Sequence, residues 1–183
     1  SLATQPQCQL HSRPMSRLPK KLHWLFWEHD IDILARVLEF GAGTGSFAEL
    51  LFREYLPVDA SYLGLDVSPV MVELARETLA PFRERAAVRL TEGSVTLDLP
   101  DASFDRVVSA FVLDLLSPDD IRPLLSEGHR ILRPSGLLCL ASLTYGRTPV
   151  SRLVTGIWVR LRALNPRIVG GCRPVNLHDF LPT

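Results

Sequence analysis

Three glycines that directly follow an apolar segment constrain this chain more than any other feature. Residues 37–47 read VLEFGAGTGSF, with glycine at positions 41, 43 and 45. Glycine permits tight turns and a close approach of a ligand to the backbone, both of which a side chain would block. The residues that follow have an amphipathic pattern, and the first amides of such a helix favour a carboxylate or a phosphate. The motif therefore predicts a strand, a ligand-binding turn and a helix.

Apolar runs of strand length alternate with helix-like segments from residue 36 onward. We predict strands at 36–40, 61–66, 86–93, 104–112 and 136–146, with helices at 46–56, 68–79 and 117–132. This alternation predicts an α/β, Rossmann-like, doubly wound parallel sheet of five strands with helices on both faces. The last run, GLLCLASLTYG, is apolar nearly throughout, which is typical of a central strand buried on both faces. Ligands of such sheets bind at the carboxyl ends of the strands.

Three kinds of ligand are compatible with a glycine-rich turn at this position. A phosphate-binding P-loop requires G-x-x-x-x-G-K-[ST], and the absence of lysine between residues 22 and 183 excludes it. A dinucleotide fold requires G-x-G-x-x-G, and Ser46 stands where the third glycine belongs, which weakens this hypothesis without excluding it. The third ligand is a nucleoside that carries an amino-acid tail in place of a pyrophosphate.

Four segments favour the third ligand, because the chain resembles the class I S-adenosylmethionine-dependent methyltransferases in all of them. They are VLEFGAGTG, LGLDVSPVMVELA, LPDASFDRVVSAFVLDLL and EGHRILRPSGLLCLASL, in the order and spacing of that family. They cover residues 36 to 145 and are most similar to the small-molecule branch related to ubiquinone and menaquinone biosynthesis methyltransferases. The resemblance implies S-adenosylmethionine as cofactor and S-adenosylhomocysteine as product.

The resemblance also implies roles for individual residues. The methionine end of the cofactor would be held by Glu39, Gly41, Ala42, Gly43, Thr44 and Gly45. Asp66 would accept hydrogen bonds from both ribose hydroxyls, which suits a carboxylate with two acceptor oxygens. Val67 and Met71 would line the adenosine, Val95 would pack on the adenine, and Ala110 and Phe111 would lie beside the reacting centre.

One departure from the family pattern concerns the adenine. The family has Gly-Asp-Ala after the third strand, whereas this chain has Gly93, Ser94 and Val95. Ser94 still accepts a hydrogen bond from the adenine amine, but without a charge, which weakens binding by about 1 kcal/mol.

The catalytic residue is the least predictable part of the sequence, because a sulfonium methyl donor needs alignment and exclusion of water more than a base. No [DN]-P-P-[FYW] motif of amino-directed members follows the fourth strand, where the chain reads AFVL. This favours a small apolar or aromatic acceptor that is methylated on oxygen, carbon or sulfur. For Asp114 a capping role is favoured over that of a base. The alternatives are a methyltransferase-like scaffold without turnover and, less favoured, an NAD-dependent oxidoreductase.

The resemblance suggests a division into three parts. Residues 1–17 are expected to be a flexible leader, and 18–145 the S-adenosylmethionine-binding domain with an N-terminal lid helix. Residues 146–183 are expected to be a helical or irregular cover for the substrate or for the sheet edge. The family's sixth and seventh strands are not recognisable after Gly171, which would leave the fifth strand as an exposed apolar edge. We expect that edge to be covered by the C-terminal residues, by a second copy or by another protein, or the chain to be a truncated form.

Composition limits the compartment and the partners. Three widely spaced cysteines without a C-x-x-C pair encode neither a disulfide framework nor a zinc site, so a metal is not expected. The same pattern predicts a cytoplasmic location. Residues 28–127 carry nineteen acids and eight bases, while both ends are basic. The basic residues are not dense enough for a nucleic-acid interface, and we expect them to pair with the acidic middle. No apolar run approaches the roughly 18 residues of a transmembrane helix.

Overall fold

The computed structural model describes residues 35–93, 96–146, 148–165 and 171–180. Strands and helices alternate along these residues, as predicted. The strands are β1 (Arg36–Phe40), β2 (Ser61–Asp66), β3 (Ala86–Leu90), β4 (Phe104–Ala110) and β5 (Leu132–Ala141). The helices are α2 (Ser46–Glu54), α3 (Pro69–Thr78), α4 (Pro118–Ile131) and α5 (Pro149–Leu164), with short 3-10 helices η1 (Ala80–Phe82) and η3 (Leu177–Asp179).

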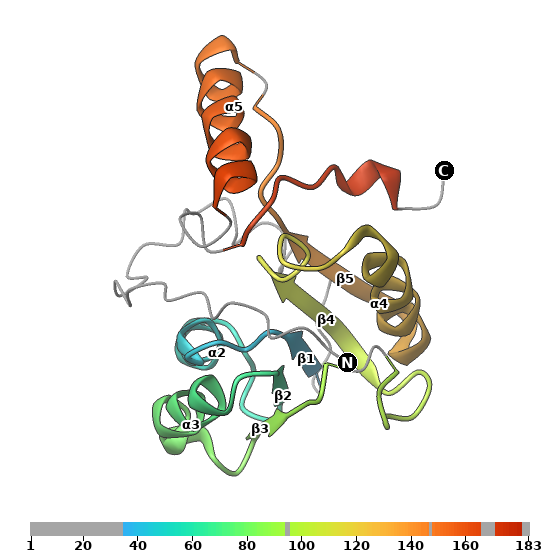
Figure 1. Ribbon diagram of the computed structural model, residues 1–183. Coiled ribbons are helices and arrows are strands. Elements are labelled where there is room, and N and C mark those ends of the chain that lie inside the picture. The colour runs from blue at the N-terminus through green and yellow to red at the C-terminus, as the bar shows by residue number, and fades with distance from the viewer. Residues whose placement is uncertain (1–34, 94–95, 147, 166–170, 181–183) are drawn as a thin grey trace.

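The five strands form one parallel sheet in the order β3-β2-β1-β4-β5. β1 therefore lies at the centre, between β2 and β4 (Figure 1). The sheet grows outward from β1 to β3 on one side and from β4 to β5 on the other, so the strand order switches between β1 and β4. Ligands of open parallel sheets bind at the carboxyl ends beside such a switch. The glycine turn that follows β1 lies at this position, and the predicted Rossmann-like fold is confirmed.

Local sequence explains where two of the helices begin. Ser68 precedes α3 and Ser117 precedes α4, and each hydroxyl accepts a hydrogen bond from an amide of the first turn. A proline follows each serine, where its missing N–H removes no helical bond. Pro123 lies inside α4, where we would expect a distortion, but the helix continues without a break to Ile131.

The hydrophobic core has two layers, one on each face of the sheet (Figure 1). The first layer joins the sheet to α2 and α3 and contains Val37, Ala48, Phe52, Tyr62, Val72, Ala75, Val88 and Val108. The second joins the sheet to α4 and contains Leu38, Phe40, Leu63, Leu65, Val107 and Ile131. Successive residues of β1 enter opposite layers because side chains alternate along a strand. The central strand is thereby fixed from both sides.

β5 is an edge strand, and the prediction that it is buried on both faces is wrong. Only Cys139 is buried in it, and the other residues of the strand are half-buried or exposed. β5 pairs with β4 alone, so an apolar run does not by itself distinguish a central strand from an edge. Its start at Leu132 also precedes the predicted residue 136, while β3 and β4 end before the predicted residues 93 and 112. No strand follows β5 in the part of the chain that the structure describes.

Residues 171–180 lie against α4 and the end of β5. Val175 is buried, and its amide donates a hydrogen bond to the carbonyl of Leu143 at 2.7 Å. Its side chain packs in a cluster with Ile121 and Leu125 of α4, and Leu140 of β5 borders that cluster. These contacts cover one face of the end of β5. Cover of the open edge by a second copy or another protein stays a prediction.

Two predictions concern residues that the structure does not describe. The flexible leader 1–17 and the lid helix before β1 both lie outside the described residues, so the domain boundaries at 17 and 145 stay predictions. Among the helices that are described, none is both long enough and apolar enough to cross a membrane.

Leu38 tests the importance of the central strand. Its side chain is fully buried in β1 between β2 and β4. We expect Leu38→Ala to lower the free energy of unfolding by about 2–5 kcal/mol, because it removes buried apolar contacts and leaves a cavity. Urea denaturation measures this value. Val58→Ala, at a position that is 79% exposed, should change stability by no more than about 0.5 kcal/mol. Equal losses in the two variants would contradict this account of the core.

Candidate functional site

The glycine turn is attached to the end of β2. The amides of Gly41 and Ala42 both donate to the carbonyl of Leu65, at 2.7 and 3.0 Å. The next amide, of Gly43, donates to Oδ2 of Asp66 at 2.9 Å. Three successive amides after β1 thus bind the last two residues of β2. The turn is held over the neighbouring strand and does not extend into solvent.

Close packing against neighbouring elements requires glycine at the first and last positions of the turn. Gly41 has φ +75°, and a Cβ there would lie 2.2 Å from Cγ2 of Val112. Gly45 has φ +77°, and a Cβ there would lie 3.1 Å from the backbone of Ala75 in α3. The first glycine lets the loop after β4 meet the loop after β1, and the last lets α2 pack closely on α3.

Gly43 differs from the other two glycines. It has φ +54°, yet a Cβ at this position would have no atom of the described residues within 4 Å. No packing within the described protein requires a glycine there. The backbone at Gly43 therefore borders open space at the carboxyl edge, as a cradle for a ligand would. Thr44 follows, with its hydroxyl 2.9 Å from that of Ser46.

Asp66 ends β2 and faces the turn, as predicted. Its Oδ2 accepts the Gly43 amide, and its Oδ1 accepts the Ser68 amide at 2.9 Å. A carboxylate offers about four acceptor positions. Two of these remain after the two backbone bonds, which matches the number needed for two neighbouring hydroxyls of a ribose. The carboxylate can therefore hold the turn and bind a ligand at once.

Glu39 is buried in β1 and pairs with Tyr62 of β2. The phenol hydroxyl donates to Oε2 of Glu39 at 2.5 Å, and the two residues are only 2% and 3% exposed. Gly64 lies opposite Glu39 in the parallel register, and a Cβ there would lie 2.8 Å from the Tyr62 hydroxyl and from Cβ of Ala42. Glycine at 64 thus provides the room in which the tyrosine reaches the acid.

The protonation of Glu39 follows from this environment. The pKa of the carboxyl is raised from 4.5 to about 8, chiefly by burial and also by the charge of Asp66, while the hydrogen bond from Tyr62 opposes this rise. Burial also raises the pKa of Tyr62 well above 10, and the charge of Glu39 adds to this. The pair consequently shares a hydrogen bond with little net charge. A cation beside Glu39 would favour the ionised carboxylate.

The residues that are predicted to line the adenosine, as far as the structure describes them, lie around the end of β2. Val67 is exposed, Met71 is half-buried in the first turn of α3, and the Met71 amide donates to the Ser68 hydroxyl. Gly93 has φ +76°, and a Cβ there would lie 3.7 Å from the Val67 side chain. The loop after β3 thus reaches the loop after β2. Ser94 and Val95 lie outside the described residues.

Ala110 and Phe111 lie at the carboxyl end of β4, next to the glycine turn. Phe111 has φ +60°, a region that side-chain-bearing residues rarely adopt, and its amide donates to the carbonyl of Ala141 at 2.8 Å. Its aromatic side chain is 54% exposed. Such strain persists where surrounding contacts hold the backbone, and it is frequent at ligand sites.

Asp114 is fully buried and bridges two loops, which differs from the capping role that the sequence favoured. Its carboxylate accepts hydrogen bonds from the Ser142 hydroxyl and the Leu143 amide, and its own carbonyl accepts the amide of Arg173. Burial raises the pKa of Asp114, while these two hydrogen bonds and the charge of Arg173 lower it. A carboxylate that is engaged in this way is a poor candidate for a base.

Asp105 is structural as well. Its carboxylate accepts the Arg36 amide at 2.7 Å and pairs with the guanidinium of Arg133, which links the starts of β1, β4 and β5. This lies at the amino edge of the sheet, opposite the glycine turn.

The structure brings most of the predicted residues together at one edge. A hydrogen bond links the turn to Asp66, Tyr62 of the same strand holds Glu39, and Val112, next to Phe111, lies against Gly41. The analysis of the sequence missed Tyr62, Gly64 and Val112. A buried tyrosine needs a partner for its hydroxyl, and an acid on the same face of the adjacent strand is the signal that would have revealed this pair.

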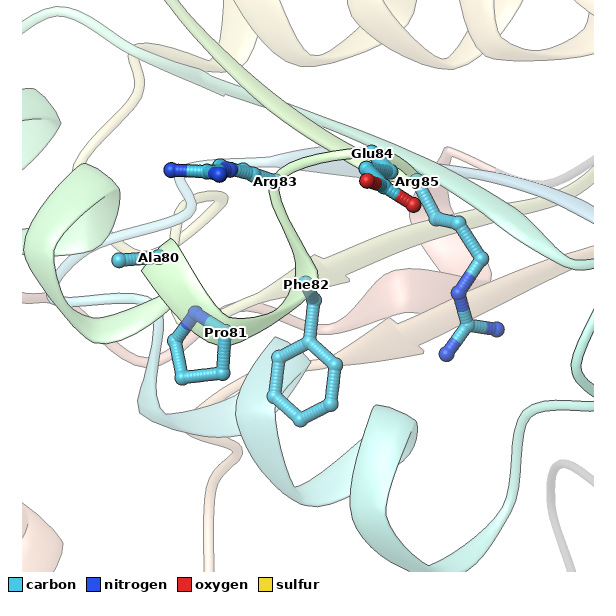
Figure 2. A pocket seen from close by; sticks show the side chains of 6 residues that line it. All are labelled: Ala80, Pro81, Phe82, Arg83, Glu84 and Arg85. Atoms are coloured by element: carbon cyan, nitrogen blue, oxygen red, sulfur yellow. The ribbon is translucent and has the colours of Figure 1, made fainter.

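A surface pocket of about 330 Å³ lies elsewhere, beside η1 and the start of β3 (Figure 2). It is lined by Ala80, Pro81, Phe82, Arg83, Glu84 and Arg85. The Phe82 ring stacks on Phe52 at 4.7 Å, and the Arg85 guanidinium donates to the carbonyls of Pro57 and Val58. These contacts hold the η1 turn on α2, at the amino end of β3 and away from the glycine turn.

The donor set at the carboxyl edge fits an adenosine with a charged amino-acid tail better than a metal. The open backbone at Gly43, the remaining acceptor positions of Asp66 and the acid at Glu39 are all suited to such a molecule. In the described parts of the chain, no three His, Cys, Asp or Glu side chains come together in a way that would hold a metal ion.

The sheet order and this edge define a Rossmann-like α/β protein of the nucleoside-binding kind. Residues 37–136 match the model of a methyltransferase domain, which is more than half of the chain. The chain belongs to this methyltransferase domain family. The resemblance that the four sequence segments indicated is confirmed.

Two curated relatives and one crystal structure are similar to this region. Demethylmenaquinone methyltransferase of Tropheryma whipplei (strain Twist) is 34% identical over 111 residues, which are 61% of this chain and 43% of that protein. Carboxy-S-adenosyl-L-methionine synthase of Photorhabdus laumondii is 30% identical over 108 residues, 58% of this chain and 42% of that protein. The crystal structure of YcgJ from Bacillus subtilis has a TM-score of 0.59 and 27% identity, covering 79% of this chain and 57% of that one. The chain spans less than half the length of the two curated relatives.

Glu39 predicts a pH dependence of stability. Its pKa is raised in the folded chain to about 8 from an ordinary value of 4.5, so between these values the folded chain binds more protons than the unfolded chain. Stability should therefore fall as the pH rises from about 4.5 to about 8, by at most about 1.4 kcal/mol per pH unit. Glu39→Gln should remove this part of the slope. Urea unfolding at a series of pH values measures it, and parallel curves for both proteins would disprove the assignment.

Proposed function

We propose that this chain binds S-adenosylmethionine at the carboxyl edge of β1, β2 and β4 and transfers its methyl group to a small molecule. The observation that carries the proposal is the hydrogen bond between the glycine turn and Asp66. The Gly43 amide binds the carboxylate, while the Cα of the same glycine borders open space. This contact supports a backbone cradle at Gly43 with a ribose acceptor at Asp66 beside it.

Each end of the cofactor has a partner in this arrangement. We infer that Asp66 binds the ribose hydroxyls through its two remaining acceptor positions, and that Val67, Met71 and Gly93 border the adenosine. The turn at 41–45 and Glu39 bind the methionine tail. The ammonium of that tail favours the ionised form of Glu39, so we expect cofactor binding to release a proton at neutral pH. Ser94 and Val95 complete the adenine site in this proposal.

Methyl transfer mainly requires that the protein position the cofactor and the acceptor. The cofactor supplies a methyl group that its sulfonium already activates. The chain aligns the acceptor and excludes water, and the apolar residues after β4 suit that task. Asp114 is engaged in structural hydrogen bonds, which supports a mechanism without a base from this position.

The acceptor is proposed to be apolar or aromatic and to be methylated on oxygen, carbon or sulfur. The exposed ring of Phe111 beside the turn and the apolar residues at 110–113 support this class. A panel of phenols, thiols and amines, assayed for released S-adenosylhomocysteine, tests it. Turnover of amines alone would contradict the proposed acceptor class.

Binding and turnover together distinguish the proposed enzyme from its alternatives. Calorimetry with S-adenosylmethionine, S-adenosylhomocysteine and NAD should show binding of the first two. Binding without turnover of any acceptor would favour a scaffold protein, and binding of NAD alone would refute the proposal. We further infer a cytoplasmic location from the unpaired spacing of the cysteines.

Gly43→Ala tests the cradle. We expect a loss of stability of about 1–2 kcal/mol from the positive φ, and a loss of affinity for S-adenosylhomocysteine of about tenfold or more, because the methyl group enters the ligand space. Calorimetry and urea unfolding measure the two effects. Gly156→Ala is the matched control, since a Cβ there also has no neighbour within 4 Å and its helical backbone is unstrained. Unchanged affinity in Gly43→Ala would refute the cradle.

Asp66→Asn tests the ribose acceptor. An amide provides one oxygen in place of two, so it cannot accept the Gly43 and Ser68 amides and two hydroxyls together. We expect about tenfold or more weaker binding of S-adenosylhomocysteine by calorimetry. Asp59→Asn, at an exposed position at the opposite edge of the sheet, should bind as the parent chain does. Equal binding by the two variants would show that Asp66 does not hold the ligand.

A further inference from the structure

α5 exposes a continuous apolar stripe. None of its residues is buried, and Figure 1 shows the helix rising away from the sheet. Seven aliphatic side chains of α5 are more than one-third exposed; Val159 lies on the opposite side of the helix, and the other six are Val150, Leu153, Val154, Ile157, Leu161 and Leu164. At the angular spacing of an α-helix they fall within an arc of about 100°. Contiguous apolar surface of this kind marks a contact with a protein or a membrane.

Arginines border this apolar stripe. Arg160 lies next to Leu153 on one side of the helix, and Arg162 lies beyond Val154 and Trp158 on the other. Residues 149–165 contain three arginines and no acid. The side chain of Arg160 is exposed. The charge of the helix therefore suits an anionic partner.

The Arg162 side of the helix is attached to the rest of the chain. The Trp158 indole donates to the carbonyl of Cys172 at 3.2 Å, and the Arg162 guanidinium donates to the carbonyl of Gly171 at 3.2 Å. These two bonds fix the rotation of α5 about its axis. The apolar stripe is thereby turned away from the segment at 171–172.

We propose that α5 docks on an anionic phospholipid surface, with the apolar stripe in the boundary between headgroups and acyl chains and the arginines on the phosphates. At 16 residues the helix is about 24 Å long, shorter than a span and long enough to lie in the interface. Aliphatic residues on one face with flanking arginines and no acids are the composition of interfacial helices. The proposal does not depend on methyl transfer.

A second copy of the chain is a poorer partner for this stripe. Two α5 helices paired through their stripes would bring arginines together without any acid on either helix. The other exposed apolar side chains of the described residues include Val58, Val67, Leu90 and Phe111, which lie on separate loops and strands. No second helix in the described structure offers a bare apolar face of the same length.

Docking in this way would bring the carboxyl edge close to the lipid. β5 ends at Ala141 and α5 begins at Pro149, so the helix is attached at the edge that carries the turn at 41–45. Leu143 and Tyr145, in the connection, are exposed as well.

Vesicle co-sedimentation of the full chain tests the proposal. We expect binding to phosphatidylcholine vesicles that contain phosphatidylglycerol, little binding to phosphatidylcholine alone, and weaker binding at higher salt. The double variant Leu153→Gln, Ile157→Gln should lose most of the binding. Arg160→Gln should weaken it about fivefold, and Arg160→Lys should retain it. Val58→Gln and Arg89→Gln, at exposed positions outside α5, are the matched controls.

Several outcomes would overturn the proposal. One is no binding to the anionic vesicles at low salt, and another is binding that the α5 variants leave unchanged. A third is a dimer in the absence of lipid that the double variant converts to a monomer, which would assign the stripe to a second copy. Because no α5 residue is buried, the variants should keep the parent circular dichroism and urea midpoint, and this comparison identifies any loss of binding that comes from misfolding.

Discussion

The attachment of the glycine turn to the end of β2 is the interaction on which the rest of the site depends. The amides of Gly41, Ala42 and Gly43 bind the carbonyl of Leu65 and the carboxylate of Asp66. A turn with three glycines would otherwise sample many conformations. The attachment selects one, and it does so with the same carboxylate that we propose as the ribose acceptor. Order in the turn and the capacity to bind a ligand therefore share one origin.

The order of elements could be predicted because it is encoded locally. The strands repeat with apolar runs, and α3 and α4 begin with a capping serine followed by proline, so each signal lies within a few residues of what it predicts. The apolar run of β5 does not itself show that this strand lies at the edge; that expectation came from the resemblance, because the sixth and seventh strands are not recognisable. The run reports apolar surroundings, and α4 and Val175, which are distant in the sequence, supply part of them.

The candidate site likewise has one part that could be predicted from the sequence and one part that could not. The turn was found because its glycines directly follow a strand, and Asp66 because the resemblance implies a ribose acceptor at the end of the second strand. The pairing of Glu39 with Tyr62 joins residues 23 positions apart, and it requires glycine at 64 in the register opposite Glu39. Such a contact depends on which strands are neighbours. It becomes visible only when the sheet order is known.

Asp114 has a consequence for the mechanics of the chain. Its carboxylate joins the loop after β4 to the residues that follow β5, and its carbonyl joins both to Arg173. Hydrogen bonds thus join three segments that are distant in the sequence at a single buried residue. We therefore expect a shift of residues 171–180 to displace the loop that carries Phe111 as well.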